Sequence, residues 1–333
     1  MTSDRKRFQI RRGLTIFLES GGGHAVTILL FIGYCLLFSY LSIAQHESLQ
    51  THAFDLGYPD QVVWNTAHGR PFACSLSTRG PNCLGEHFSP ILALLAPLYW
   101  LWPDVRTLLI LQTVVIALGA FPVFWLARER LKSDLAGLSF SAAFLLFPAL
   151  EAANMFDFHA VTLAPSFLLF AFYYLERRRY KVFLLFALLA MACKEEIPLL
   201  ICMMGLYLAL VKREWKLGSL VIVGGLVWFL AAIYIVIPHF NTQGRSHVLS
   251  WYAYLGDGPL EIAITVIRNP LLILRTVLTP LKVKYILDLL LPGAFTSLFS
   301  PQTLLLLLPS LAINLLSTYP PMSVLEEFHY AGP

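Results

Sequence analysis

Charged residues are scarce in this chain of 333 residues: Asp, Glu, Lys and Arg make up only 13% of it, whereas hydrophobic residues make up 57%. This balance excludes an ordinary soluble domain, because a single soluble core stops growing before it needs so much apolar side chain. The net charge of +4 does not indicate a nucleic-acid partner, because the basic residues stand in short clusters between apolar runs, as they do in the cytoplasmic loops of membrane proteins. We therefore expect an all-α polytopic membrane protein embedded in the lipid bilayer.

Several familiar catalytic and ligand-binding motifs are absent. The sequence has no HExxH motif for a metalloprotease and no GxxxxGK[ST] phosphate loop. It has five cysteines, but no CxxC and no Cys/His spacing typical of structural zinc. The GGG at 21–23 precedes an apolar run and carries no nucleotide signal. A functional site, if there is one, must therefore be built from residues that are far apart in the chain.

Four clusters of basic residues set the expected topology. Because cytoplasmic loops carry an excess of Lys and Arg, we place all four clusters inside the cell. The N-terminus is then cytoplasmic, and residues 1–24 form a basic tail. The apolar run 25–44 is too long for a signal-peptide core, so we expect it to remain as the first span in the inner (cell) membrane. The clusters are the N-terminal tail, 128–132, 177–181 and 212–216.

About nine transmembrane helices follow from this topology, with juxtamembrane helices on the outer face. Residues 88–102 are apolar, but as a helix they would be only about 22 Å long, short of the roughly 30 Å bilayer core. Because a span there would also move three basic clusters outside, we expect an interfacial helix, and a second, amphipathic one over 261–279. The stretch 182–211 could be one long helix, but a hairpin broken near Pro198 fits the basic clusters better. The expected spans are about 25–44, 104–127, 134–150, 160–176, 182–194, 197–211, 217–237, 283–299 and 302–316.

A single transmembrane domain is expected over residues 25–333, with outer loops at 45–103 and 238–280. In this topology the final stretch, from 317 onward, also lies outside. The chain stops soon after an outward span and has no closing basic tail. We therefore expect it to be incomplete at its C-terminus.

Acidic and histidine side chains recur at the outer ends of the spans. Asp55 and Asp60 follow the first span, and Asp55 stands between two apolar residues. A carboxylate in such a setting can serve as a general base, although acids beside Gly and Pro also mark turns. Glu86 and His87 precede the interfacial helix and could be an acid–base couple, metal ligands or the start of a helix. We expect these four residues to be catalytic.

Two further patches on the same face are candidates for substrate binding. Asp157 and His159 lie in an otherwise largely apolar turn, NMFDFHA, which favours side chains that point inward. Lys194 and Glu195, in ACKEEIPL, are either a self-compensating ion cluster at a hairpin tip or a phosphate site, since lysine neutralises a phosphate as a point charge. Arg70 adds a positive group on this face. We expect these five residues to bind the substrate and its phosphate.

A divalent metal ion, Mg²⁺ or Mn²⁺, could bind on the same face. Asp55, Glu86, Asp157 and His159 carry suitable ligand atoms. No spacing motif among them demonstrates a site, so the cofactor stays open.

Cys74 and Cys83 both lie in the first outer loop. If that face of the membrane is oxidising, the two can form a disulfide; the alternative is a pair of free loop thiols. The other three cysteines lie in or beside spans, where packing roles are usual.

The same motifs carry a resemblance to a known family. The segments 54–72, 85–103, 147–165 and 192–199 and the final EFHYAGP resemble domain-of-unknown-function family 2079, a family of predicted prokaryotic multi-pass membrane proteins. The resemblance covers nearly the whole chain, with the motifs in the same order. Family members typically continue beyond the HY segment, which again implies a shortened chain. The family is similar in layout to the membrane-embedded GT-C glycosyltransferases, which have an acidic motif in the first outer loop; the resemblance implies that Asp55 corresponds to their catalytic acid.

These observations lead us to expect a GT-C-like integral membrane glycosyltransferase, which moves a sugar from a polyprenyl-phosphate donor to an acceptor on the outer side. Asp55 would deprotonate or orient the acceptor hydroxyl, and Lys194 would hold the phosphate leaving group. A transporter or lipid flippase is the alternative, because intramembrane charges also serve substrate paths, but transporter sites lie near the bilayer midplane. A non-catalytic membrane scaffold, with purely structural charged turns, is the third reading.

Overall fold

The computed structural model describes residues 22–243 and 247–325. Most of the expected basic tail and the final EFHYAGP motif lie outside these residues. Within them the regular secondary structure is helical, apart from an isolated β-bridge between Ala73 and Asn82. The expected all-α class is therefore confirmed for the part of the chain that the structure describes.

Three helices among the described residues are long and apolar enough to cross a membrane: α2 (Gly23–Glu47), the continuous stretch Arg106–Leu131, and the stretch Trp215–Phe240. At 1.5 Å per residue, α2 is about 37 Å long, more than the bilayer core. α7 (Asp134–Leu145) and α8 (Pro148–Met155) pass the same test as a pair bent by 44°. Proline at the start of α8 explains the bend, because it cannot donate a backbone hydrogen bond to the preceding turn.

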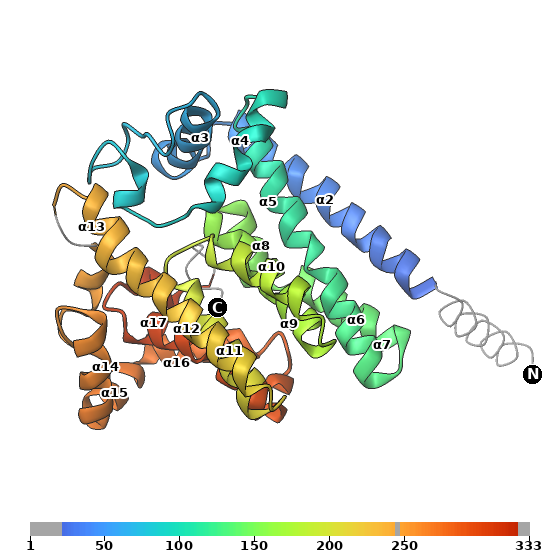
Figure 1. The fold of residues 1–333 in the computed structure, drawn as a ribbon. Coiled ribbons are helices and arrows are strands. Elements are labelled where there is room, and N and C mark those ends of the chain that lie inside the picture. The colour runs from blue at the N-terminus through green and yellow to red at the C-terminus, as the bar shows by residue number, and fades with distance from the viewer. Residues whose placement is uncertain (1–21, 244–246, 326–333) are drawn as a thin grey trace, which may run out of the picture.

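Shorter apolar helices fill the space between the long ones (Figure 1). α10 (Tyr180–Met191) and α11 (Ile197–Leu210) form a hairpin with Pro198 in the first turn of α11, so the expected break is confirmed. The Arg106–Leu131 stretch consists of α5 (Arg106–Leu118) and α6 (Ala120–Leu131), and the Trp215–Phe240 stretch of α12 (Trp215–Ala231), a π-helical turn and α13 (Ile237–Phe240). The other elements that bear on the site are η2 (Cys83–Gly85), η3 (Ala160–Leu163), α9 (Ala164–Glu176), α17 (Pro301–Leu316) and η7 (Pro320–Ser323).

Glycines allow α12 to lie against α11. A Cβ atom added to Gly218 would stand 2.7 Å from the backbone oxygen of Gly205, and one added to Gly225 would stand 2.7 Å from Sγ of Cys202. Small residues let two helix backbones approach closely, which is how helices associate in lipid. The opposite side of α12 exposes large apolar side chains such as Leu220, as expected for a surface that faces lipid.

Two expectations about the C-terminal half are wrong. A single helix over 283–299 does not form: α16 (Pro280–Leu290) ends at Leu290, and the chain then turns before α17. The amphipathic stretch over 261–279 is two helices, α14 (Pro259–Arg268) and α15 (Pro270–Val277), because Pro270 interrupts the backbone hydrogen bonding. Neither α14 nor α15 buries a residue in the structure.

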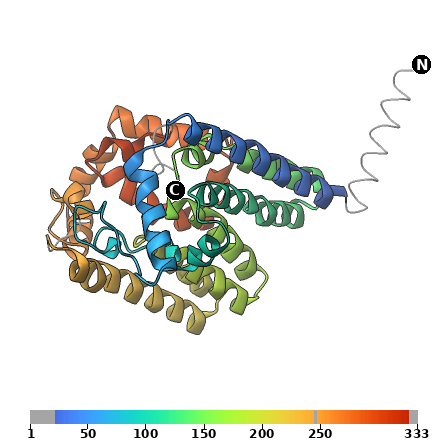
Figure 2. The same ribbon diagram turned by 90° about the horizontal axis from the view of Figure 1, so that it is seen from above.

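The stretch expected to be the first outer loop contains a helix that its sequence did not suggest. α3 (Ala53–Ala67) lies with α4 (Ile91–Leu101) at one end of the molecule, and seen from above it crosses that end (Figures 1 and 2). Pro59 lies inside α3, in a stretch that we expected to be part of a loop. The Tyr99 hydroxyl in α4 donates a hydrogen bond of 2.5 Å to Asp60 in α3, which holds the two helices together. Polar residues that were singled out from the sequence lie near this end of the molecule, around one cavity.

Candidate functional site

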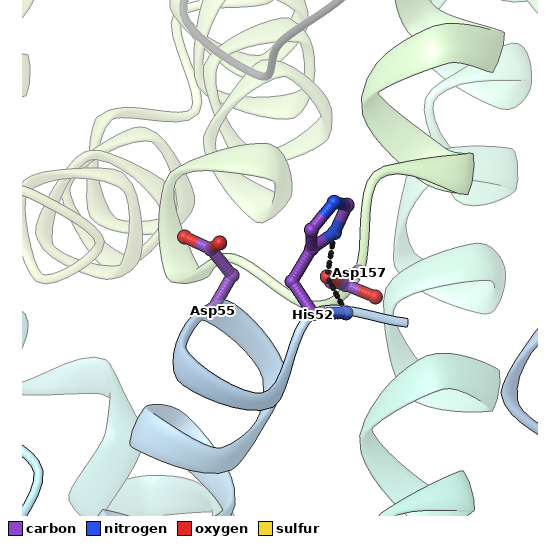
Figure 3. Close-up of side chains that lie close together, drawn as sticks. All are labelled: His52, Asp55 and Asp157. Atoms are coloured by element: carbon purple, nitrogen blue, oxygen red, sulfur yellow. Dashed lines mark hydrogen bonds and ion pairs between the residues drawn. The ribbon is translucent and has the colours of Figure 1, made fainter. Parts of the chain in front are cut away.

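His52, just before α3, ties the start of that helix to the turn between α8 and α9. Its backbone N–H donates a 2.9 Å hydrogen bond to Oδ2 of Asp157, and its ring Nδ1 lies 2.9 Å from the same oxygen (Figure 3). Asp157 is buried and has a left-handed backbone, with φ of 55°. Its other carboxylate oxygen, Oδ1, is buried without a hydrogen-bond partner. A partnerless buried carboxylate oxygen is costly and therefore calls for an explanation.

The side chain of Gln112 holds this turn in place through hydrogen bonds. It is a fully buried polar residue in the middle of α5. Its side-chain Nε2 donates hydrogen bonds to the backbone oxygens of Asp157, at 2.6 Å, and Asn154, at 3.1 Å. Its Oε1 accepts from the backbone N–H of His159 at 2.9 Å and from the hydroxyl of Thr162 at 2.6 Å. One amide thus satisfies several buried polar groups of a turn that has no regular hydrogen bonding of its own.

Asp55, in the first turn of α3, faces His159. The distance from Oδ1 of Asp55 to Nε2 of His159 is 3.7 Å. Hydrogen bonding to His159 is the main influence that lowers the pKa of Asp55 below its ordinary value, against a smaller opposing effect of burial. Asp55 is therefore an ionised carboxylate at neutral pH.

Glu195 joins the start of α4 to the turn between α10 and α11. Its Oε1 lies 2.9 Å from Nδ1 of His87, and its Oε2 accepts the backbone N–H of Phe88 at 3.0 Å. The backbone N–H of Ile91 also donates to the carbonyl of Ala192 at 2.9 Å. Burial raises the pKa of Glu195, but the charge and hydrogen bond of His87 outweigh it, and the pKa is lowered overall. The buried Glu195 thus fixes the orientation of the His87 ring.

Lys194 and Glu86 complete the set of charged residues at this end. Nζ of Lys194 lies 2.8 Å from Oε1 of Glu196, and both side chains are largely shielded from solvent. Glu86 is buried, and its Oε2 has no hydrogen-bond partner. A second buried carboxylate oxygen therefore lies unpaired in the same region as that of Asp157.

A cavity of about 160 Å³ brings these residues together from four separate segments of the chain. Its wall includes charged and titratable side chains from α3, from the loop before α4, from the turn before α9 and from the α10–α11 turn. Tyr58, Phe54 and Phe158 supply an aromatic part of the wall. Of the residues singled out from the sequence, the wall contains Asp55, Glu86, His87, His159 and Lys194.

His52, Asp55 and Asp157 form a group that could hold a metal ion, since one ligand atom from each lies within 4.8 Å of the others (Figure 3). Of the four ligands expected from the sequence, Asp55 and Asp157 belong to this group, whereas Glu86 and His159 do not, and His52 is added to it. The two carboxylates suit Mg²⁺ or Mn²⁺, and the imidazole suits transition metals better than Mg²⁺. The buried, unpaired Oδ1 of Asp157 shows that this carboxylate has capacity for a further partner.

All residues of this cavity fall within one family match. A model described as "Predicted membrane protein (DUF2079)" matches residues 45–331, which is most of the chain. The chain belongs to the DUF2079 family. No curated protein and no solved structure matches it.

Four of the residues singled out from the sequence do not line the cavity of this DUF2079 chain. Glu195 contacts His87, which lines the cavity, and Asp157 contacts His52, which does not. Asp60 faces away, toward Tyr99, and burial raises its pKa. Arg70 is exposed at the far end of α3, with its guanidinium 5.1 Å from the centre of the Trp64 ring. We therefore do not assign Asp60 or Arg70 to this site.

Cys74 and Cys83 are both buried and lie on adjoining segments of the loop between α3 and α4. The backbone N–H of Cys74 donates to Pro81 at 3.0 Å, and that of Cys83 donates to Phe72 at 2.9 Å. The structure has both as free thiols, and a hydrogen bond from Cys83 lowers the pKa of Cys74 to about 7. The disulfide between them stays a prediction.

The sequence reading of this DUF2079 chain missed His52 and Gln112. Gln112 could have been found, because a lone amide inside an apolar span rarely faces lipid. His52 stands three residues before Asp55, which puts the two on the same side of a helix start. That signal was hidden because α3 itself was read as a loop.

Proposed function

We propose that this chain is a GT-C-like integral membrane glycosyltransferase that moves a sugar from a polyprenyl-phosphate donor to an acceptor on the outer side of the membrane. The observation that carries the proposal is the cavity at which Asp55, His87, His159 and Lys194 meet. Sugar transfer from a phosphate needs a group that accepts the acceptor's proton and a cation beside the leaving phosphate. Both kinds of group line this cavity.

The proposed step is a single displacement. The hydroxyl oxygen of the acceptor attacks the anomeric carbon of the sugar, and a new glycosidic bond forms. The bond between that carbon and the phosphate oxygen breaks, and the lipid phosphate leaves with the electron pair. Asp55, ionised at neutral pH because of His159, takes the proton of the hydroxyl. Lys194 stabilises the negative charge on the departing phosphate.

The remaining polar groups position the reactants. His87, oriented by Glu195, and Glu86 face the cavity and can bind sugar hydroxyls. A divalent ion, if the reaction uses one, would be held by His52, Asp55 and Asp157 and would neutralise charge on the donor phosphate.

The proposed setting is the inner membrane, with the N-terminus in the cytoplasm and the cavity on the outer side. The short apolar helices α9, α10, α11 and α17 enter the bilayer alongside the long ones, and α4 lies at the outer interface. The structure has no single helix over 283–299, so that span is not proposed again. This arrangement keeps every basic cluster on one side of the membrane.

Turnover of lipid-linked sugar in reconstituted vesicles tests the proposal. The full chain is supplied with radiolabelled polyprenyl-phosphate sugars extracted from cell membranes. Asp55→Asn keeps the shape of the side chain but removes the base, and we expect it to slow sugar release about 10²- to 10⁴-fold. Asp60→Asn is the matched control, because it makes the same change in the same helix away from the cavity, and it should keep most of the activity. Equal activity in the Asp55→Asn variant and the wild type would rule the proposal out.

A further inference from the structure

A second cavity, of about 410 Å³, lies on the other side of Lys194, between α9, α11 and α17. Its wall is mostly apolar, with Leu168, Phe172, Leu200, Met204, Leu306 and Leu307 among its residues. This volume falls within the range of about 300–1,000 Å³ that is usual for small-molecule sites. The cavity is thus large enough for part of a ligand, and its chemistry suits a hydrocarbon.

The two cavities meet at Lys194 and Val161, which line both of them. Lys194 therefore stands at the boundary between a polar space and an apolar one. Its ammonium contacts Glu196, and a lysine carries three N–H donors, so it can serve more than one acceptor. A ligand that spans both cavities would have its charged group at this boundary.

Charge decides where along such a ligand the negative group can lie. The polar cavity holds the carboxylates of Asp55 and Glu86, which would repel an anion placed deep inside it. The apolar cavity offers little to solvate an anion. The position beside Lys194 is the one at which an anionic head meets a fixed cation and its hydrocarbon chain meets apolar walls.

We propose that the apolar cavity holds the hydrocarbon segment next to the head of a lipid phosphate with a single chain, with Lys194 at its phosphate. This inference rests on the proposed function and deepens it, since it states how the lipid part of the substrate is recognised and makes α17 a part of the binding site. A lipid chain that enters the cavity leaves one apolar medium for another, so the gain comes from packing and from placement of the head. We therefore expect loss of the chain contacts to weaken binding about 10-fold, which corresponds to 1.4 kcal/mol of packing free energy.

Binding of defined lipid phosphates to the full chain in nanodiscs tests the inference. The probes are undecaprenyl phosphate, the short-chain analogue citronellyl phosphate, and dioleoyl phosphatidic acid, which has two chains. Leu200→Trp fills the apolar cavity from α11, and Met204→Phe fills it with less strain. Leu185→Trp is the matched control, because Leu185 is exposed on α10. We expect both filling variants to weaken binding of undecaprenyl phosphate and of citronellyl phosphate about 10-fold, because the head-proximal chain of each would enter this cavity, with little change in the control.

Each outcome bears on one proposal. If the filling variants bind undecaprenyl phosphate like the wild type, the tail site is overturned, while sugar turnover by the wild type would leave the proposed function standing. If the filling variants lose binding but no preparation releases sugar, the tail site stands and the glycosyltransferase fails. Phosphatidic acid that binds as tightly as undecaprenyl phosphate overturns the single-chain ligand. Lys194→Ala should weaken both single-chain probes, and selective loss of only the long one would contradict the placement of the head.

Discussion

The side-chain amide of Gln112 donates a 2.6 Å hydrogen bond to the backbone oxygen of Asp157, although α5 and the turn before α9 are separate in sequence. The oxygen of the same amide accepts a hydrogen bond from the backbone N–H of His159. The two residues that pair with His52 and Asp55 are therefore held in place by a side chain that lies outside the cavity.

Gln112→Leu should destabilise the protein, because it removes hydrogen bonds to buried backbone groups of the turn. Leaving such groups unsatisfied costs about 1–3 kcal/mol each, and we expect a total loss of about 2–4 kcal/mol. Thermal unfolding in detergent measures it. Gln302→Leu is the control, since that glutamine is exposed. Equal midpoints for the two variants would contradict the role of Gln112.

Glu195 should make the protein more stable at neutral than at acid pH. Its pKa is lowered in the folded state by His87 despite burial. The stabilisation is therefore fully present above its ordinary pKa and is lost as the pH falls through the lower, folded-state value. Glu195→Gln should lower the unfolding midpoint clearly at about pH 7 and much less at about pH 3. Glu47→Gln, at an exposed ion pair, is the control and should change the unfolding midpoint little at either pH. If Glu195→Gln lowers the midpoint equally at both pH values, the charge of Glu195 does not stabilise the fold.

The proposed topology predicts opposite accessibility for Arg70 and Arg130, which are both exposed. In a background without the native cysteines, Arg70→Cys should react with an impermeant thiol reagent added to intact cells, because the α3–α4 end lies outside. Arg130→Cys should react only after the membrane is opened. Labelling of the Arg130→Cys protein in intact cells would overturn this topology, and labelling of Arg70→Cys as well would make 88–102 a true span.

Cys74 and Cys83 should be joined by a disulfide in protein taken from an oxidising compartment. The lowered pKa of Cys74, about 7, makes its thiolate available at neutral pH. Closing so short a loop would stabilise the fold by roughly 2–3 kcal/mol. Mass spectrometry of alkylated, unreduced protein measures the bridge. Recovery of both cysteines as alkylated residues would show that the thiols stay free.

The helical class could be predicted from the sequence because long apolar runs leave few alternatives in lipid. The predicted helix boundaries failed in two places. Gly57 and Pro59 belong to a stretch that was expected to be a loop, yet both lie in α3, whose side chains pack on α4. The apolar run after Lys284 was read as part of a span, but its helix ends at Leu290. In α3 the packing on α4 outweighed the local signals, whereas α16 ends just before Pro292 and Gly293, which interrupt a helix.

The residues of the candidate site could be predicted in part from their expected depth in the membrane alone. Asp55, Glu86, His159 and Lys194 were all assigned to the outer ends of spans, and the structure has them around one cavity. Their pairing could not be predicted in this way. Whether Glu195 contacts a phosphate or a histidine depends on how α4 docks against the α10–α11 turn, and sequence spacing carries no information about that.

The order of the cavity walls along the chain has a consequence for biogenesis. Every wall of the polar cavity comes from residues up to Lys194, whereas one wall of the apolar cavity is α17, near the end of the described chain. During synthesis the charged groups are therefore all present before α17 emerges from the ribosome. A nascent chain that has inserted only through α12 holds the reactive residues with one side open to the bilayer, and α17 closes that side last.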